Sequence, residues 1–381
     1  MNRETPDLIT TSAGLERLTA ILEAAPVVAV DSEMDSFYCY REKICLVQFS
    51  TENADYLVDA LRLDLSPLGR VFDDPERVAV FHAGENDIPY FRHQYGFGFR
   101  RLFDTYLAAR VLGYPQCGLA GLLETHFQVS LDKKFQMADW RIRPLPADMA
   151  EYARMDTRYL LRLREVLLSE LREAGRLAEA ESEFRRAAAA VWTEKTFDPN
   201  GWIRLKGARK APARAKGCLR SLYAWREGEA SRRNLPAFRI LPDHLLVTLA
   251  TTLPEDLQAL REMARHPTLE TCGPAILEAL HEGRALGKVP VPLSRGRSDE
   301  MLTREQESAF RSLRTWRNRS CAERGVEPDR VIPNRILRQI AQFAPSTPEE
   351  LARVPGMESW RMTEYASEIL EVLQSSPPRL V

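Results

Sequence analysis

Short apolar runs separated by polar, turn-forming residues are the main pattern in the first half of the chain. They predict β-strands over residues 27–33, 44–50, 55–59, 77–82 and 102–104. The first three strands are joined by connections that look too short for a parallel crossover, so we expect them to be antiparallel. The later strands alternate with helical segments. The first half is therefore expected to form an α/β domain with a mixed sheet and helices.

Helical spacing of apolar residues occurs at both ends of this half. Leu15, Leu18, Ile21 and Leu22 fall on one helical face, and Ser12 is the expected N-cap. A longer helical region is predicted over residues 147–177.

The second half of the chain has no good strand pattern and contains a repeat. Residues 219–246 align without gaps to residues 310–337, which predicts two copies of one small all-α domain. The matching residues Trp225 and Trp316 are expected to lie in the cores of the two copies rather than to stack on bases. A stretch rich in Pro, Gly and Ser separates the copies and predicts a linker.

These patterns give a domain layout. We expect an α/β domain over residues 1–205, a first helical domain over 211–290, a linker over 291–304 and a second, diverged helical domain over 305–381.

Composition narrows the class of protein. The 381 residues are 44% hydrophobic and 28% charged, which is typical of a globular chain, and the net charge of −1 gives no indication of a nucleic-acid ligand. No apolar stretch approaches the roughly 20 residues of a membrane span, and the N-terminus has no apolar signal core. The six cysteines are scattered without zinc-type spacing. A cytoplasmic protein is the plain expectation.

Acidic residues stand at the ends of several predicted strands and helices. Asp31 and Glu33 end the strand over 27–33, and residues i and i+2 of a strand point to the same face. Asp87 follows the strand over 77–82, and Tyr152 and Asp156 share one face of the long helical region. Each group alone has an ordinary explanation: a strand end in solvent, a helix-capping carboxylate or a surface pair.

Together these sites supply four carboxylates and one phenol, which indicates a metal centre. Two carboxylates held side by side repel each other unless a cation or a proton lies between them. Mg²⁺ prefers oxygen ligands, and two ions about 4 Å apart can stabilise both the attacking and the leaving oxygen of a phosphoryl displacement. We therefore expect Asp31, Glu33, Asp87 and Asp156 to bind two divalent ions, Mg²⁺ or Mn²⁺.

These motifs resemble those of the DEDD superfamily of 3′–5′ exonucleases, in the subclass that has tyrosine in the third motif. The matching motifs are Asp31-x-Glu33, His82-Ala83-Gly84 with Asp87, and Tyr152-x3-Asp156.

Two further resemblances cover most of the remaining chain. Residues 132–160 resemble the ribonuclease D family through Asp139-Trp140 and Arg143-Pro144-Leu145, although Ala138 stands where that family usually has serine. The repeated domain resembles the helicase-and-RNase-D C-terminal (HRDC) domain.

The resemblance implies a ribonuclease-H-like fold and a metal-dependent hydrolase that releases nucleoside 5′-monophosphates from a 3′ end. It implies that Asp31, Glu33 and Asp156 hold the ion nearer the nucleophile, and that Asp31 and Asp87 serve the second ion. Tyr152 would position the attacking water, because a phenol with a pKa near 10 is a poor base at neutral pH. The expected catalytic residues are Asp31, Glu33, Asp87, Tyr152 and Asp156.

Candidate nucleic-acid contacts come from two stretches. Residues 203–220 contain basic residues and no acid, and these could follow phosphates, although a solvated linker explains them equally well: Arg204, Lys206, Arg209, Lys210, Arg214, Lys216 and Arg220. Lys133, Lys134 and Gln136 are further candidates, and a surface loop explains them as well. His82 is expected to be structural rather than a ligand, because the expected metals are hard, and Asp104 is expected at a helix start.

The resemblance favours a monomeric exoribonuclease that trims tRNA precursors and other structured RNA 3′ ends. The alternatives are a 3′–5′ DNA exonuclease with the same chemistry and a non-catalytic nucleic-acid-binding adaptor. Discrimination between RNA and DNA depends on contacts to the 2′-hydroxyl, which the sequence does not reveal. Four convergent acids argue against the adaptor, while the preferred RNA, the choice between Mg²⁺ and Mn²⁺, and protein partners stay open.

Overall fold

The structure is a computed structural model that describes residues 8–194, 196–287, 289–290 and 302–375. The chain forms two compact units, and each is described by itself. The first unit comprises Met1–Glu33, Ile44–Trp192 and Asp299–Val381, and the second comprises Met34–Lys43 and Thr193–Ser298.

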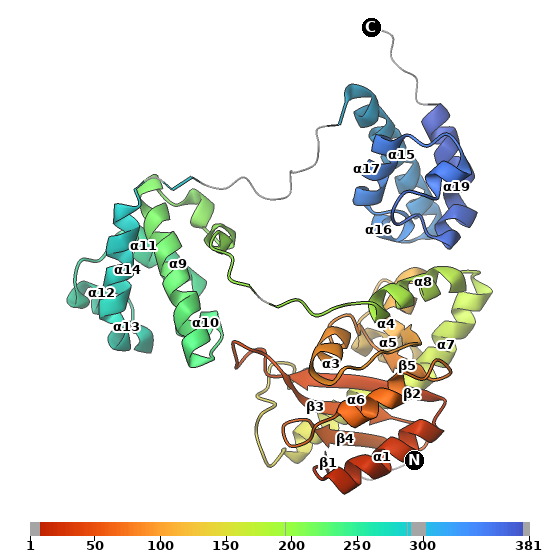
Figure 1. The fold of residues 1–381 in the computed structure, drawn as a ribbon, viewed down its shortest axis with the longest axis horizontal. Coiled ribbons are helices and arrows are strands. Elements are labelled where there is room, and N and C mark those ends of the chain that lie inside the picture. The colour runs from red at the N-terminus through yellow and green to blue at the C-terminus, as the bar shows by residue number, and fades with distance from the viewer. Residues whose placement is uncertain (1–7, 195, 288, 291–301, 376–381) are drawn as a thin grey trace. The chain divides into compact units, whose positions relative to one another are not determined.

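A six-stranded mixed sheet organises the first unit (Figure 1), as the sequence predicts. Its order is β1-β4-β3-β2-β5-β6; β3 and β4 are antiparallel, whereas β1 pairs with β4, β2 with β5 and β5 with β6 in parallel. The strands are β1 (Leu8–Ile9), β2 (Val27–Met34), β3 (Ile44–Ser50), β4 (Asp55–Asp59), β5 (Val78–Phe81) and β6 (Leu102–Asp104). The two-residue strand β1 is too short to leave a pattern in the sequence, so periodicity does not predict it.

Among the described residues, eight α-helices of the first unit belong to the α/β domain. They are α1 (Ser12–Ala24), α2 (Gly69–Phe72), α3 (Ile88–Tyr95), α4 (Thr105–Leu112), α5 (Leu119–Phe127), α6 (Ala147–Arg158), α7 (Leu160–Glu173) and α8 (Leu177–Ala188). The helical region predicted over 147–177 is therefore divided: α6 gives way to α7 at Tyr159, and Gly175, with a positive φ of 66°, follows the end of α7.

Helix α1 corrects two details of the sequence prediction. Its N-cap is Thr11 rather than Ser12, because the Thr11 hydroxyl accepts the backbone N–H of Gly14. Leu15, Leu18 and Leu22 are buried as predicted, but Ile21 lies off that face and is 42% exposed.

The repeated sequence folds as two matching helical domains. Helices α9 (Ala213–Arg233), α10 (Ala237–Ile240) and α11 (Asp243–Thr252) recur at the same lengths as α15 (Arg304–Arg324), α16 (Pro328–Val331) and α17 (Asn334–Phe343). The first domain continues with α12 (Leu257–Met263), α13 (Pro267–Thr271) and α14 (Gly273–Ala285), and the second with α18 (Pro348–Leu351) and α19 (Ser359–Gln374).

One arginine makes equivalent contacts in both copies. Arg226 donates to the Leu241 carbonyl and to Asp243, at 2.8 and 2.7 Å. Arg317 donates to the Ile332 carbonyl and to Asn334, at 3.2 and 2.7 Å. The arginine of the repeat therefore fastens the first long helix to the segment between the second and third helices.

The tryptophans before these arginines differ. Trp316 is 3% exposed in the core of the second domain, as predicted, whereas Trp225 is only half-buried against the first core. The core of the first domain also includes Trp202 and Leu205. The predicted boundaries stay predictions, and most of the predicted linker, residues 291–301, lies outside the described residues.

Within the first unit, α8 contacts the second helical domain through buried ion pairs. Glu183 accepts from Arg330 at 3.1 Å and lies 3.8 Å from Arg361, and Glu179 pairs with Arg324. Glu183, Arg330 and Arg361 are all less than a tenth exposed. A buried charge of this kind is tolerated because its partners are charged as well.

Across the described part of the chain, no helix is both long enough and apolar enough to cross a membrane. All six cysteines have free thiols, and most are buried, as expected of small apolar residues.

Candidate active site

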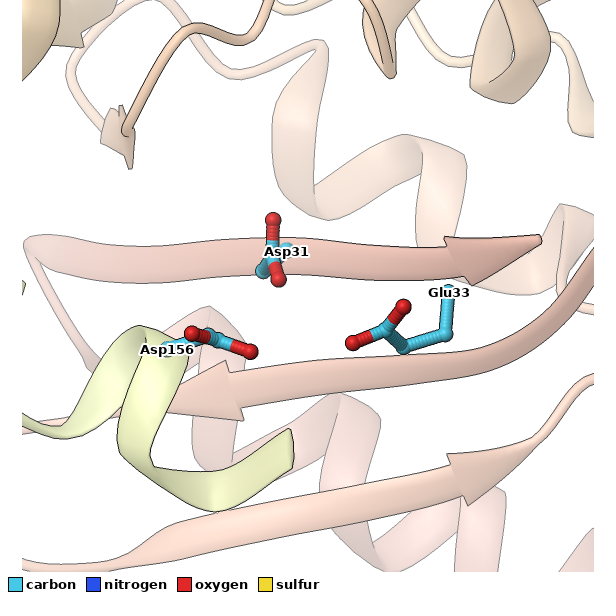
Figure 2. A group of neighbouring side chains, drawn as sticks. All are labelled: Asp31, Glu33 and Asp156. Carbon is cyan, nitrogen blue, oxygen red and sulfur yellow. The ribbon is translucent and has the colours of Figure 1, made fainter. Parts of the chain in front are cut away.

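Three carboxylates converge beside the central strand of the sheet (Figure 2). Asp31 and Glu33 project from β2, and Asp156 projects toward them from α6. A carboxylate oxygen from each of the three lies within 4.8 Å of the others. The predicted strand and helix motifs thus meet in space, although Glu33 and Asp156 are 123 positions apart in the sequence.

The strand holds its two acids in place because its preceding residues are fixed in the core. Val28, Ala29 and Val30 have no exposed surface, and Val28 and Ala29 pair with β5 in a parallel register. Alternation along the strand then directs Asp31 and Glu33 to one face and Ser32 to the other.

Burial and mutual repulsion raise the pKa values of these acids. For Asp31 and Glu33 the pKa rises well above its usual range, first through burial and then through the neighbouring carboxylates. Burial, and then the charge of Asp87, raises the pKa of Asp156 to about 7. Such a group of acids favours binding either a proton or a cation at neutral pH.

Asp87 takes a position that the sequence pattern does not predict. It is the first residue before α3, but its side chain makes no capping hydrogen bond. Its Oδ1 instead accepts a hydrogen bond of 2.6 Å from the Ser32 hydroxyl. Asp87 lies outside the group of three carboxylates, and burial raises its pKa to about 7 despite the Ser32 bond.

Ser32 is therefore part of the site, although it points to the face of β2 opposite Asp31 and Glu33. Its hydroxyl links the first motif to the second across 55 residues of sequence. A serine between two acids gives no periodic signal, so sequence reasoning does not identify it.

Tyr152 packs against the aromatic residues of the loop before α6. Its ring lies 5.7 Å from Phe135, edge to face, and 6.1 Å from Trp140. Burial, and then the charges of Asp156, Glu33 and Asp31, raises the pKa of the phenol above its ordinary value. Tyr152 therefore stays protonated at neutral pH and is suited to orient a water molecule rather than to remove its proton.

A pocket of about 490 Å³ opens beside the carboxylates. Its lining includes Asp31, Tyr152, Asp156 and His82, and the predicted substrate-contact residues Lys133 and Gln136. Lys134 does not line it: its ammonium pairs with Asp148 and lies over Phe135.

Asp104 holds the second motif in place. It caps α4 through the Leu107 N–H, as the sequence predicts, and it also accepts the N–H groups of Ala83 and Gly84 at 3.1 and 2.8 Å. Ala83 has a positive φ of 61°, so these bonds stabilise a backbone that a non-glycine residue seldom adopts.

Arg143 fastens the loop that carries Lys133 and Gln136. Its guanidinium donates to both carboxylate oxygens of Asp59, at 2.7 and 2.8 Å, and to the Cys45 carbonyl at 2.9 Å. Asp59 is completely buried. The paired geometry anchors the loop and the start of α6 to strands β3 and β4.

The basic residues of 203–220 belong to the second unit. Five of them are exposed, Lys216 and Arg220 are half-buried, and Arg204 pairs with Asp198 at 2.7 Å. Their predicted contact with nucleic acid stays a prediction.

The three converging acids fit a hard divalent cation. All their donor atoms are oxygens, their charges are buried together, and among the described residues no basic side chain makes a salt bridge to any of the three within 4.0 Å.

Known proteins share both the sequence and the fold of the chain. Residues 6–172 match the sequence model of a 3′–5′ exonuclease domain, and residues 215–280 and 306–373 each match that of the HRDC domain. Ribonuclease D from Gluconacetobacter diazotrophicus is 33% identical over 374 residues, which cover 96% of this chain and 92% of that protein. Ribonuclease D from Granulibacter bethesdensis is 31% identical over 371 residues, with coverage of 96% and 92%.

Solved structures agree with these matches. The catalytic core of RRP6 from Trypanosoma brucei superposes with a TM-score of 0.68 at 27% identity, over 75% of this chain and 84% of that one. RNase D from Escherichia coli superposes with a TM-score of 0.65 at 24% identity, over 98% of this chain and 100% of that one. This match shows a similar fold.

Proposed function

Since the chain belongs to the ribonuclease D family of 3′–5′ exonucleases, with an exonuclease domain followed by two HRDC domains, we propose that it trims the 3′ ends of structured RNAs, tRNA precursors among them. Family membership confirms the resemblance noted in the sequence and identifies the chain as an exonuclease hydrolase. The observation that carries the proposal is the convergence of Asp31, Glu33 and Asp156 beside a pocket.

Enzymes of this family use divalent metal ions, and we propose two, Mg²⁺ or Mn²⁺, for this chain. Asp31, Glu33 and Asp156 would hold one ion, and Asp31 and Asp87 would serve the other. Bound there, the ions would supply positive charge next to the attacking and leaving oxygens.

The remaining side chains would orient the reactants. Tyr152 keeps its proton and would hydrogen-bond to the attacking water. Lys133 and Gln136, on the pocket wall, would hold the phosphate backbone of the RNA strand. The products would be a shortened RNA and a nucleoside 5′-monophosphate. A monomer in the cytoplasm is the expected form of the enzyme.

The direct test uses purified full-length protein with matched 5′-labelled RNA and DNA oligonucleotides in Mg²⁺, Mn²⁺ or EDTA. We expect a metal-dependent ladder that shortens RNA from its 3′ end. Faster loss of DNA would support a DNA exonuclease instead, and binding without turnover in either metal would support a non-catalytic adaptor.

We further propose that the basic residues of 203–220 bind phosphates of the RNA. Replacing Lys206, Arg209 and Lys210 with glutamine should weaken RNA binding and reduce the slope of affinity against salt by about one for each phosphate that is no longer neutralised. Fluorescence-anisotropy titrations from about 50 to about 200 mM salt measure this slope. An unchanged slope would assign the residues to a solvated surface.

A further inference from the structure

His82 lines the pocket, yet the hydrolytic reaction as proposed does not use it. It follows β5 directly, and β5 pairs with β2 in parallel through Ala29 and Val80. Continuing this register by two residues would place His82 next to Asp31, and both residues line the pocket. The imidazole is therefore close to where the RNA strand would be cut.

A hydrogen-bond chain fixes the tautomer of this imidazole. The Thr105 hydroxyl donates its single hydrogen to the Phe81 carbonyl at 3.1 Å. It must therefore accept at its contact with His82, where Nδ1 lies 2.9 Å from Oγ1. Nδ1 carries the hydrogen, so Nε2 has a free lone pair. In the described part of the chain no residue is hydrogen-bonded to Nε2.

With its hydrogen on Nδ1, the uncharged imidazole acts toward a ligand as a hydrogen-bond acceptor at Nε2.

Few groups of a nucleic-acid strand can donate to such an acceptor. Phosphate and ring oxygens of the backbone only accept. Within the sugar–phosphate chain, the donor at an internal nucleotide is the ribose 2′-hydroxyl, which DNA lacks. We propose that His82 Nε2 accepts a hydrogen bond from a ribose 2′-hydroxyl next to the scissile bond and thereby favours RNA over DNA.

This inference rests on the proposed exoribonuclease activity and adds a specificity-determining residue to it. The carboxylates recognise charge, and Lys133 and Gln136 would contact phosphate, so none of these groups requires a 2′-hydroxyl. His82, which follows β5, would make the contact with the sugar. Thr105, at the start of α4, holds the imidazole in the required tautomer.

The test uses full-length protein and a short 5′-labelled RNA. Copies of this RNA carry a single 2′-deoxy or 2′-fluoro sugar at the last, second-last or third-last nucleotide. Fluorine keeps an RNA-like sugar but cannot donate a hydrogen bond, so it separates the contact from sugar shape. For the wild type we expect both changes to lower kcat/KM about tenfold at one of the three positions, the usual value of one good hydrogen bond.

Two variants at position 82 are matched to this geometry. His82→Asn keeps an N–H that can reach Thr105 but has no acceptor where Nε2 lies. It should lose about tenfold on all-ribose RNA and nothing further on the sensitive deoxy RNA. His82→Gln carries an oxygen that reaches farther and should recover part of the discrimination. Thermal unfolding with and without Mg²⁺ identifies any variant that fails to fold.

Thr105→Val provides an independent variant. It removes the acceptor that fixes the tautomer while leaving the imidazole in place, and it should reduce discrimination at the same sugar.

Two results would overturn the inference: equal slowing of every substrate by His82→Asn, or a wild type indifferent to all single sugar changes. Absence of any RNA turnover by the wild type would instead remove the proposed function, and the inference with it.

Discussion

At the scale of single residues, the three converging carboxylates give the sharpest prediction. Asp31→Asn removes one charge from the group without changing its shape. We expect single-turnover hydrolysis of RNA to fall by about 10²–10³-fold or more, the usual effect of removing one interaction made in the transition state. RNA binding should be retained, because the change also removes electrostatic repulsion. Asp64→Asn, outside the pocket, is the matched control and should hydrolyse RNA at the wild-type rate.

The raised pKa values predict how metal binding depends on pH. Asp87 and Asp156 titrate near pH 7 in the metal-free fold, but near 4 when unfolded. Between those values the folded state binds more protons than the unfolded state, so the free energy of unfolding of the metal-free protein falls as pH rises. A cation replaces these protons.

The gain in Tm caused by Mg²⁺ over EDTA should therefore increase from pH 5.5 to pH 8. Differential scanning calorimetry measures it directly. Asp31→Asn should show a smaller gain at pH 8, and an equal gain at both pH values in the wild type would contradict the assignment of these acids to a cation.

At the scale of elements, Arg143 connects the loop before α6 to the sheet. Arg143→Ala removes the bidentate partner of the buried Asp59 and leaves it the Leu61 N–H, at 3.1 Å, and the largely exposed Arg62, at 3.6 Å. We expect a loss of about 3 kcal/mol of stability, the size of a broken buried pair, together with a rise in KM because Lys133 and Gln136 lose their support. Urea unfolding and steady-state kinetics measure the two effects.

Arg141→Ala is the control for Arg143. Its pair with Asp139 lies at the surface, where such pairs contribute about 0–1 kcal/mol. If both variants lost equal stability, the buried pair with Asp59 would not be what anchors the loop.

Much of the fold could be predicted because period and spacing are local properties. Such patterns predict the strands over 44–50 and 55–59. They also predict the two copies of the helical domain, whose first helices begin 91 positions apart, at Ala213 and Arg304. The grouping of Asp31, Glu33 and Asp156 could be expected as well, because their motifs are short local patterns, whereas their role as metal ligands stays a prediction.

The remaining features depend on contacts between distant segments. Three such contacts join residues that are 20 to 84 positions apart: the Ser32–Asp87 bond, the bonds of Asp104 to Ala83 and Gly84, and the Arg143–Asp59 pair. Local periodicity carries no information about such pairs, and a helix-start aspartate looks the same in sequence whether or not it also holds a neighbouring loop.

At the scale of the whole first unit, the ion pairs on α8 should determine how firmly the second helical domain is held. Glu183→Gln leaves Arg330 and Arg361 buried with less compensating charge. The pKa of Glu183 is lowered by these arginines against the effect of burial, so its contribution is present above about pH 4 and is lost on acidification.

We expect Glu183→Gln to cost about 3 kcal/mol and to speed proteolytic removal of the second helical domain. Calorimetry and limited proteolysis at neutral pH measure both. Glu323→Gln breaks only the exposed pair with Arg319 and serves as the control. Identical digestion of wild type and Glu183→Gln would show that apolar packing alone holds the domain.

Because side chains alternate between the two faces along β2, the site depends on the number of residues in this strand. Inserting one residue after Ala29 would slide the following positions to the opposite face of the sheet. Asp31 and Glu33 would then turn away from Asp156, and Ser32 away from Asp87, although no residue of the site had been replaced. A second inserted residue would restore the faces. Inserting an odd number of residues in this strand should therefore abolish activity. Inserting an even number should preserve part of it.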